Sequence, residues 1–442
     1  MSMDQIAAVI MMVLLLGMVI CGIHLAFALM FLAITFGLIF QGASIFPMSM
    51  LKSFGTMESE ILIAVPLFVF MGTILEKSEV AEGVYQSLYE LFGPVRGGLA
   101  FATVITCTIF ASCTGVIAAT VTTMTLLAVP SMLRRNYDKG LATGVVCAGG
   151  SLGILIPPSV MLVMYGPMAN LSVAQLFAGA LFPGLLLAVL YLAYIGLGAG
   201  LKPDLAPAIG EEERSIKGRN IWVNAALHML PALFLILAVL GSIIGGIASP
   251  TEASGVGAFA ALIIAAAYRK LTYNNVKEAA YTTLIVTAMV FFIIIGADIF
   301  NSVFLFLGGG ALIKSMLMSL PFGKWFVLSV MMFILFILGF FISWQGLLFI
   351  VVPIFLPVAT NLGFSPLWFG ILICLNLQMS FLTPPFAYAI FFVKGAAPPE
   401  VKTWDIYRGV IPFVLLQAVG LFICIVFPEI ILWLPRVTLG GG

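Results

Sequence analysis

The chain has 442 residues, of which 62% are hydrophobic and 8% are charged, with a formal net charge of +1. A soluble domain of this length does not have such a composition, so the sequence predicts an all-α polytopic membrane protein. Neither the net charge nor any basic cluster in the sequence indicates a nucleic-acid partner.

The N-terminal quarter is predicted to contain three spans and one interfacial helix. Apolar runs over residues 6–21, 25–40 and 61–75 indicate membrane helices, and the first run lacks the basic region and cleavage site of a signal peptide. Residues 41–60 are interpreted as a mixed loop. Residues 78–91 place apolar side chains at helical spacing with glutamates between them, which predicts an amphipathic helix in the interface.

Small polar residues interrupt the apolar run over residues 97–133 at positions 111–115. Each side of this interruption is about half to three-quarters as long as a membrane span. We therefore favour a re-entrant helical hairpin, with its tip at residues 112–115, over the alternative of one long tilted helix.

The next apolar run, residues 141–164, has three glycines and the Pro157-Pro158 pair in its middle. Proline lacks a backbone N–H and pushes the preceding residue out of the helical region. A helix over residues 141–153 should therefore stop, unwind over residues 154–158 and restart. Carbonyl groups freed inside a membrane need a partner from protein, water or an ion.

The second half of the chain repeats both devices. The run over residues 324–358 is interrupted at residues 343–346, and the run over residues 367–393 contains Pro384-Pro385. The other apolar runs predict spans over residues 175–201, 221–244, 252–268, 281–307 and 409–433 and a short amphipathic piece over 311–320, with polar loops over 202–219, 269–278, 361–366 and 394–408.

One constant shift along the chain superposes the two Pro-Pro pairs, and with them Gly153 on Ser380 and Ile156 on Thr383. Interrupted membrane segments at matching places in two halves point to a transport site. The alternative is a pair of kinked helices that only pack well.

The distribution of basic residues predicts the topology. With both termini outside, all but four of the 19 Lys and Arg residues lie inside, as the positive-inside rule requires. The loop after the first hairpin, residues 134–139, is basic, whereas residues 359–366 after the second hairpin carry no charge. The hairpins should therefore enter from opposite faces, which makes the repeats inverted, as in alternating-access transporters.

Broken helices and hairpin tips offer the carbonyl and hydroxyl oxygens that an alkali cation needs. The restarting helices also present free N–H groups and a positive dipole end to an anionic substrate. The candidate cation ligands are Thr114, Gly115, Gly153, Ile156, Pro158, Gly346, Ser380, Thr383 and Phe386, and the candidate substrate contacts are Ser112, Ser159, Gln345 and Pro385. The alternative is close helix packing for each glycine and a hydrogen bond back to the helix for each hydroxyl.

Two carboxylates lie in or near the apolar runs. Glu252 belongs in the first turn of a helix, where the dipole favours it, in preference to an ion-binding role. Asp298 needs a partner such as Asn301, water or a basic side chain, and is a secondary functional candidate. The six cysteines are interpreted as buried hydrophobes without disulfides, and the two histidines, His24 and His228, as interfacial polar groups.

The sequence contains no His-Glu-x-x-His or P-loop motif, so we expect no enzyme activity and no cofactor. The stretches at residues 150–159, 248–253 and 383–385 resemble the signatures of the large membrane subunit of tripartite ATP-independent periplasmic (TRAP) transporters. The resemblance covers essentially the whole chain.

This resemblance implies a sodium-driven elevator in the bacterial inner membrane. It further implies two partners, a small four-helix membrane subunit and a soluble periplasmic substrate-binding protein, and an organic acid as substrate. Sodium, the only ion it implies, would take the cation positions named above. Many members have Ser-Gly-Ser at the first hairpin tip, where this chain has Thr114-Gly115-Val116. Residues 375–383 resemble the branch linked with 2-oxo acids and other monocarboxylates more than the sialic acid branch.

We expect five parts: N-terminal scaffold helices (1–75), a first repeat (76–166), connecting and scaffold helices (167–280) with the cytoplasmic loop 202–219, a second repeat (281–393) and a C-terminal scaffold helix (394–442). Two other functions stay open. A free-standing sodium- or proton-coupled anion symporter would need no binding protein, and an intramembrane enzyme would need a catalytic cluster around Asp298.

Overall fold

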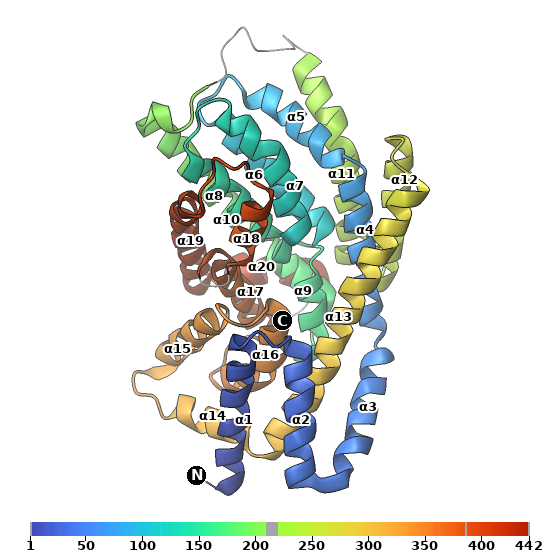
Figure 1. Cartoon of the computed structure of the whole chain (residues 1–442), viewed down its shortest axis with the longest axis vertical. Coiled ribbons are helices and arrows are strands. Elements are labelled where there is room, and N and C mark those ends of the chain that lie inside the picture. The colour runs from blue at the N-terminus through green and yellow to red at the C-terminus, as the bar shows by residue number, and fades with distance from the viewer. Residues whose placement is uncertain (1, 116, 209–219, 385–386, 441–442) are drawn as a thin grey trace.

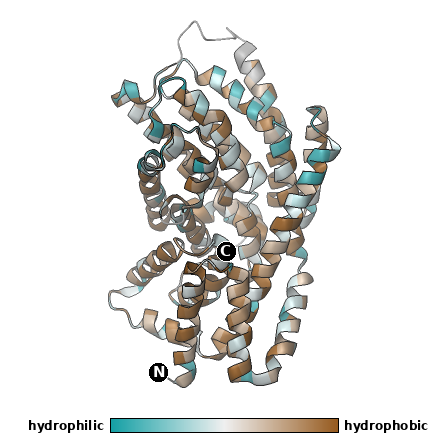
Figure 2. Cartoon of the chain, in the orientation of Figure 1, coloured by the Kyte–Doolittle hydropathy of each residue, from teal (hydrophilic) through white to brown (hydrophobic). Residues whose placement is uncertain are grey.

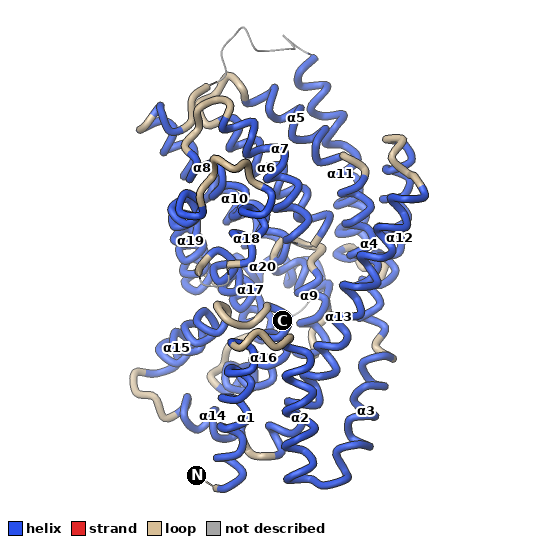
Figure 3. The backbone as a smooth tube through the Cα atoms, in the orientation of Figure 1, coloured by secondary structure: helices blue, strands red, loops and turns tan. Residues whose placement is uncertain are grey.

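The computed structural model is an elongated bundle of helices that describes residues 2–115, 117–208, 220–384 and 387–440 (Figure 1). Within these residues all regular structure is helical, as Figure 3 shows. The all-α prediction is therefore confirmed.

The first half contains α1 (Met3–Ile20), α2 (Leu25–Gln41), η1 (Gly42–Ser44), α3 (Ile45–Met57), η2 (Glu60–Ile63), α4 (Ala64–Lys77), α5 (Val80–Phe92), α6 (Gly98–Thr114), α7 (Ile117–Leu133), α8 (Lys139–Ser151), η3 (Leu152–Ile154), α9 (Val160–Ala169), α10 (Val173–Leu201) and η4 (Pro203–Leu205), where η marks a short 3-10 helix. The second half contains α11 (Asn220–Ile244), α12 (Pro250–Ala267), α13 (Tyr273–Phe306), α14 (Gly309–Met318), α15 (Gly323–Leu338), α16 (Trp344–Asn361), α17 (Pro366–Leu382), α18 (Tyr388–Ala396), α19 (Thr403–Val426) and α20 (Glu429–Leu439).

Eight helices of the described residues are long and apolar enough to cross a membrane, or up to nine if the pair Glu60–Lys77 and Val80–Phe92, bent by 57°, is one span. Large apolar side chains on their outer faces, such as Phe31, Leu237 and Phe422, are exposed, as lipid-facing positions are. Hydrophilic residues concentrate at the upper end of the molecule in Figure 2, where α5 lies.

The interrupted run over residues 97–133 forms a hairpin, not one long helix. Helices α6 and α7 pack against each other, and Gly115 joins them with a φ of +59°. This left-handed conformation favours glycine, so the interruption seen in the sequence marks the tip. In the second half, α15 and α16 flank the corresponding interruption.

Both predicted broken helices are present. Helix α8 ends at Ser151, η3 follows, and α9 restarts at Val160; helix α17 ends at Leu382 and α18 restarts at Tyr388. In Figure 1 the α6–α7 hairpin lies above the centre of the molecule and α15–α16 lies below it. The inverted relation of the two halves and the five-part division stay predictions.

Three predicted loops are wrong in whole or in part. Residues 41–60 are not a mixed loop, because η1, α3 and η2 occupy most of them, and the hydroxyls of Ser49, Ser53 and Thr56 on α3 donate to carbonyls of the same helix. Helix α13 begins within the predicted loop 269–278. The loop 394–408 is shortened at both ends, by α18 and by α19.

The last predicted span is two helices, because α19 ends at Val426 before Pro428, whose backbone cannot donate to the helix, and α20 follows. Within the predicted loop 202–219, η4 is helical and residues 209–219 lie outside the described part of the chain.

Candidate transport site

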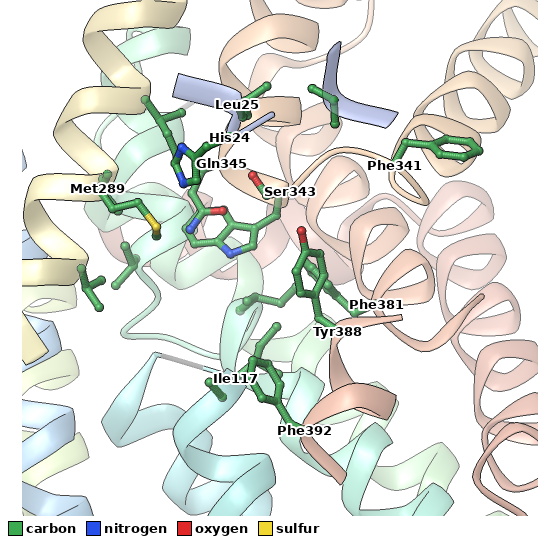
Figure 4. Close-up of a pocket in the computed structure, with 18 of the residues that line it drawn as sticks. His24, Leu25, Ile117, Met289, Phe341, Ser343, Gln345, Phe381, Tyr388 and Phe392 are labelled. Atoms are coloured by element: carbon green, nitrogen blue, oxygen red, sulfur yellow. The ribbon is translucent and has the colours of Figure 1, made fainter. Parts of the chain in front are cut away.

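A cavity of about 520 Å³ lies where the two hairpin tips and the two helix breaks meet. Figure 4 shows its side chains, which come from elements far apart in the sequence. The first hairpin contributes Gly115 and Ile117, the first break Ile154 and Val160, the second hairpin Ser343 and Gln345, the second break Phe381 and Tyr388, the α1–α2 turn His24, and α13 Met289.

The first hairpin tip rests on the first unwound segment. A Cβ atom on Gly115 would lie 3.3 Å from the carbonyl oxygen of Pro158, and one on Gly153 would lie 3.3 Å from the Cβ of Ala111. The hydroxyls of Thr114 and Thr120 lie 3.0 Å apart across the tip. The structure therefore brings four predicted cation ligands of the first half together: Thr114, Gly115, Gly153 and Pro158.

The unwound segment leaves carbonyl groups without protein donors. Ser159, a predicted substrate contact, is fully buried, and its hydroxyl donates to the carbonyl of Ile154 at 2.5 Å. This hydroxyl is therefore already hydrogen-bonded within the break. The N–H of Ile156 donates to Leu152 at 2.9 Å. Among the described residues, no donor reaches the carbonyls of Ile156 or Pro158, which is the arrangement that a cation or water completes.

The second half is arranged differently. The hydroxyl of Ser380 donates to the carbonyl of Phe336 at 3.3 Å, and that of Thr383 donates back to Met379 at 2.7 Å. Gly339, which sequence reasoning missed, packs against the Ser380 side chain, because a Cβ on it would clash there. Gly339 lies in an unbroken apolar run, so no local signal marked it.

Gly346 packs against Leu25 of α2 and Ile342, the side chains that a Cβ on it would meet. The remaining candidates of the second break, Pro385 and Phe386, lie outside the described residues, as does Val116 at the first tip. Ser112 donates its hydroxyl to Thr108 at 2.8 Å within α6.

Of the predicted substrate contacts, Gln345 lines the cavity, and three unpredicted polar residues join it: Ser343, His24 and Tyr388. His24 stands on the α1–α2 turn and Tyr388 at the restart of the second broken helix. His24 is one of only two histidines in the chain, and Tyr388 follows a break. Those are the signals that could have found them.

The two carboxylate candidates do not line the cavity. Asp298 accepts a hydrogen bond from Thr56 of α3 at 3.3 Å and interacts electrostatically with Lys52 on the same helix. Of the partners predicted for Asp298, a basic side chain is therefore present, whereas Asn301 donates to the carbonyl of Phe349 at 2.5 Å. Glu252 accepts from the backbone N–H of Ser249 at 2.7 Å, in a capping box that starts α12, which confirms its structural interpretation.

Among the described residues, no group of three or more His, Cys, Asp and Glu side chains could hold a metal ion. What the helices do bring together is neutral oxygen atoms at unwound backbone beside a central cavity. A helical membrane protein with this arrangement belongs to the class of polytopic membrane transporters.

Comparison with known proteins identifies the family. Residues 8–430 match the profile of the family described as tripartite ATP-independent periplasmic transporter, DctM component, and the chain belongs to this family. It is 30% identical to the C4-dicarboxylate TRAP transporter large permease protein DctM of Vibrio cholerae, over 98% of both chains. It is 31% identical to the Pseudomonas aeruginosa protein of the same description, over 87% of this chain and 88% of that protein.

A solved structure supports the fold. The crystal structure of the Alcanivorax borkumensis YdaH transporter aligns with a TM-score of 0.63 at 16% identity, over 93% of this chain and 98% of that chain. The protein is thus a transport protein rather than an enzyme, and a multi-pass protein of the bacterial inner membrane. Membership of the family implies a tripartite system with a small permease and a substrate-binding protein.

Proposed function

We propose that the protein is the sodium-coupled subunit of an importer for an organic acid. A periplasmic substrate-binding protein delivers the acid, and a small four-helix membrane subunit assists its transport. The names of the Vibrio and Pseudomonas relatives, which refer to C4-dicarboxylates, support a carboxylate substrate. Donors in the cavity, such as the side-chain amide of Gln345, also suit an anion.

The observation that carries this proposal is the contact of the first hairpin tip with the first unwound segment. The carbonyl oxygens of Ile156 and Pro158 have no described donor, and that of Pro158 lies beside Gly115, the residue that follows Thr114 at the tip. Neutral oxygens of this kind suit a monovalent cation, because no unpaired buried charge is left when the ion departs. A sodium ion here would hold the tip closed against the segment.

The walls of the cavity support an elevator movement. The α1–α2 turn, from the predicted N-terminal scaffold, and α13, most of which lies in the predicted second repeat but which we here assign to the scaffold, contribute one set of lining residues. The hairpins and broken helices contribute the other set. Movement of the second group against the first would carry the cavity between the two faces of the membrane. Sodium bound at the hairpin tips would bias this movement by stabilising the closed tips.

Uptake into proteoliposomes tests the proposal. The vesicles hold this protein and its small partner, with the cognate binding protein and a labelled organic acid outside, under an inward sodium gradient. We expect uptake to require both sodium and the binding protein. Uptake that a proton gradient drives without sodium would overturn the ion assignment, and uptake without any binding protein would favour a free-standing symporter.

A further inference from the structure

The central cavity has a polar end and an apolar end. In Figure 4, His24, Ser343 and Gln345 lie together, while Ile117 and Phe392 lie at the opposite end. None of the described residues that line the cavity is Lys, Arg, Asp or Glu. A molecule that fits such a lining has one polar group and an apolar body.

The polar end has unused hydrogen-bonding groups. No described residue forms a hydrogen bond with the ring of His24 or the amide of Gln345. The His24 ring makes an edge-type contact with the ring of Phe27, with centroids 6.1 Å apart. An imidazole carries at least one N–H in either protonation state, and an amide carries two. Both side chains can therefore donate to a carboxylate oxygen.

The apolar end excludes a second charge. Ile117 and Phe392 offer no side-chain donor, and a carboxylate buried between them would lose its water of hydration without gaining a partner. An apolar body in the same place gains from leaving water. The lining therefore discriminates against acids with a charge at both ends.

We propose that this cavity takes a monocarboxylate with an apolar body, and that His24 and Gln345 donate hydrogen bonds to its carboxylate. The inference rests on the proposed function only in treating the cavity as the transport site. His24 lies on the proposed scaffold, whereas Gln345 lies on the second hairpin, so the substrate bridges the two parts in the described state.

The experiment measures binding to the purified protein with its small partner, by quenching of tryptophan fluorescence. Trp344 lines the cavity, so the signal should be lost in Trp344→Phe. The probes are phenylacetate (one charge and an apolar body), acetate (the charge alone) and succinate (two charges). We expect phenylacetate to bind about tenfold or more tightly than either of the others, since its ring buries apolar area.

Substitutions locate the two ends. His24→Ala should weaken phenylacetate binding about tenfold, the usual effect of losing one hydrogen bond to a charged group, while His24→Gln keeps a donor and most of the affinity. Phe392→Ala should weaken phenylacetate but leave acetate unchanged. Cys21→Ala is the matched control, because Cys21 lies near the same turn but does not line the cavity.

Equal affinity for succinate and phenylacetate, unaltered binding in His24→Ala, or no fluorescence change with any of the three acids would each overturn the inference. Its failure is distinct from that of the proposed function. Sodium-driven uptake that is indifferent to His24 would remove only the inference. Binding of phenylacetate that needs His24 but not sodium would remove only the sodium coupling.

Discussion

Replacing Gly115 by alanine tests whether the first hairpin tip forms an ion site. The φ of Gly115 is +59°, in the left-handed region, where a residue with a Cβ costs about 1–2 kcal/mol. The new Cβ would also lie 3.3 Å from the carbonyl oxygen of Pro158, closer than ordinary van der Waals contact. The tip and the unwound segment must therefore separate slightly in the variant.

This separation should lower the apparent affinity of uptake for sodium. If about 1.4 kcal/mol of the cost falls on the ion-bound state, the sodium concentration for half-maximal uptake rises about tenfold. The assay is sodium-dependent uptake into proteoliposomes, with thermal unfolding in detergent measured in parallel.

Gly363→Ala is the matched control. Gly363 has a φ of +81° and nothing within 4 Å of a built Cβ, so it carries the backbone cost without the contact. We expect it to lower stability and leave the sodium dependence unchanged. Equal effects of the two variants on sodium dependence would refute the reasoning, because the shift would then come from general destabilisation.

Three further substitutions separate structural from functional roles. Thr383→Ala should raise the half-maximal sodium concentration for uptake several-fold. If the variant keeps the wild-type value, the Thr383 hydroxyl only bonds to its own helix and does not bind the ion. Gly409→Ala should destabilise the fold by about 3 kcal/mol, because its Cβ would enter the backbone of α8. Gly395→Ala is the control, because a Cβ there meets open space. Equal unfolding temperatures of the two variants would contradict this prediction. Thr56→Val should lower the free energy of unfolding by about 1 kcal/mol, because Asp298 loses the hydrogen bond from Thr56, and should not alter the sodium dependence of uptake. A change in that dependence would indicate that Asp298 takes part in ion binding.

The helix breaks could be predicted because their cause is local. Proline and glycine act on their own backbone and on the preceding turn, so Pro157-Pro158 marks an interruption whatever surrounds it. Equally local signals predict the hairpin tip at residues 112–115 and Glu252 in the first turn of a helix, as observed.

Helix α3 and the place of His24 could not be predicted from the apolar pattern, because α3 carries many polar side chains and the place of His24 depends on contacts distant in sequence. Residues 45–57 look polar for a membrane helix, but three hydroxyls bond back to helix carbonyls and Thr56 meets Asp298 on α13. His24 becomes a cavity residue only because α1 and α2 bring their turn to the second hairpin. Neither contact leaves a pattern in the neighbouring sequence.

The hydrogen bonds around Ser151 indicate which helices move together. Gln378 of α17 donates to the carbonyl of Ser151 at 3.1 Å, which links the two broken helices directly. Gln417 of α19 donates to the Ser151 hydroxyl at 3.2 Å and to Tyr191 of α10 at 2.9 Å. Ser151, Gln378 and Gln417 are buried, where breaking such bonds is costly. The predicted division places α10 among the connecting and scaffold helices and α19 in the C-terminal scaffold, but a rigid body that carries both breaks would have to include them. These bonds therefore favour a boundary between scaffold and mobile part that runs along the cavity wall at His24 and α13.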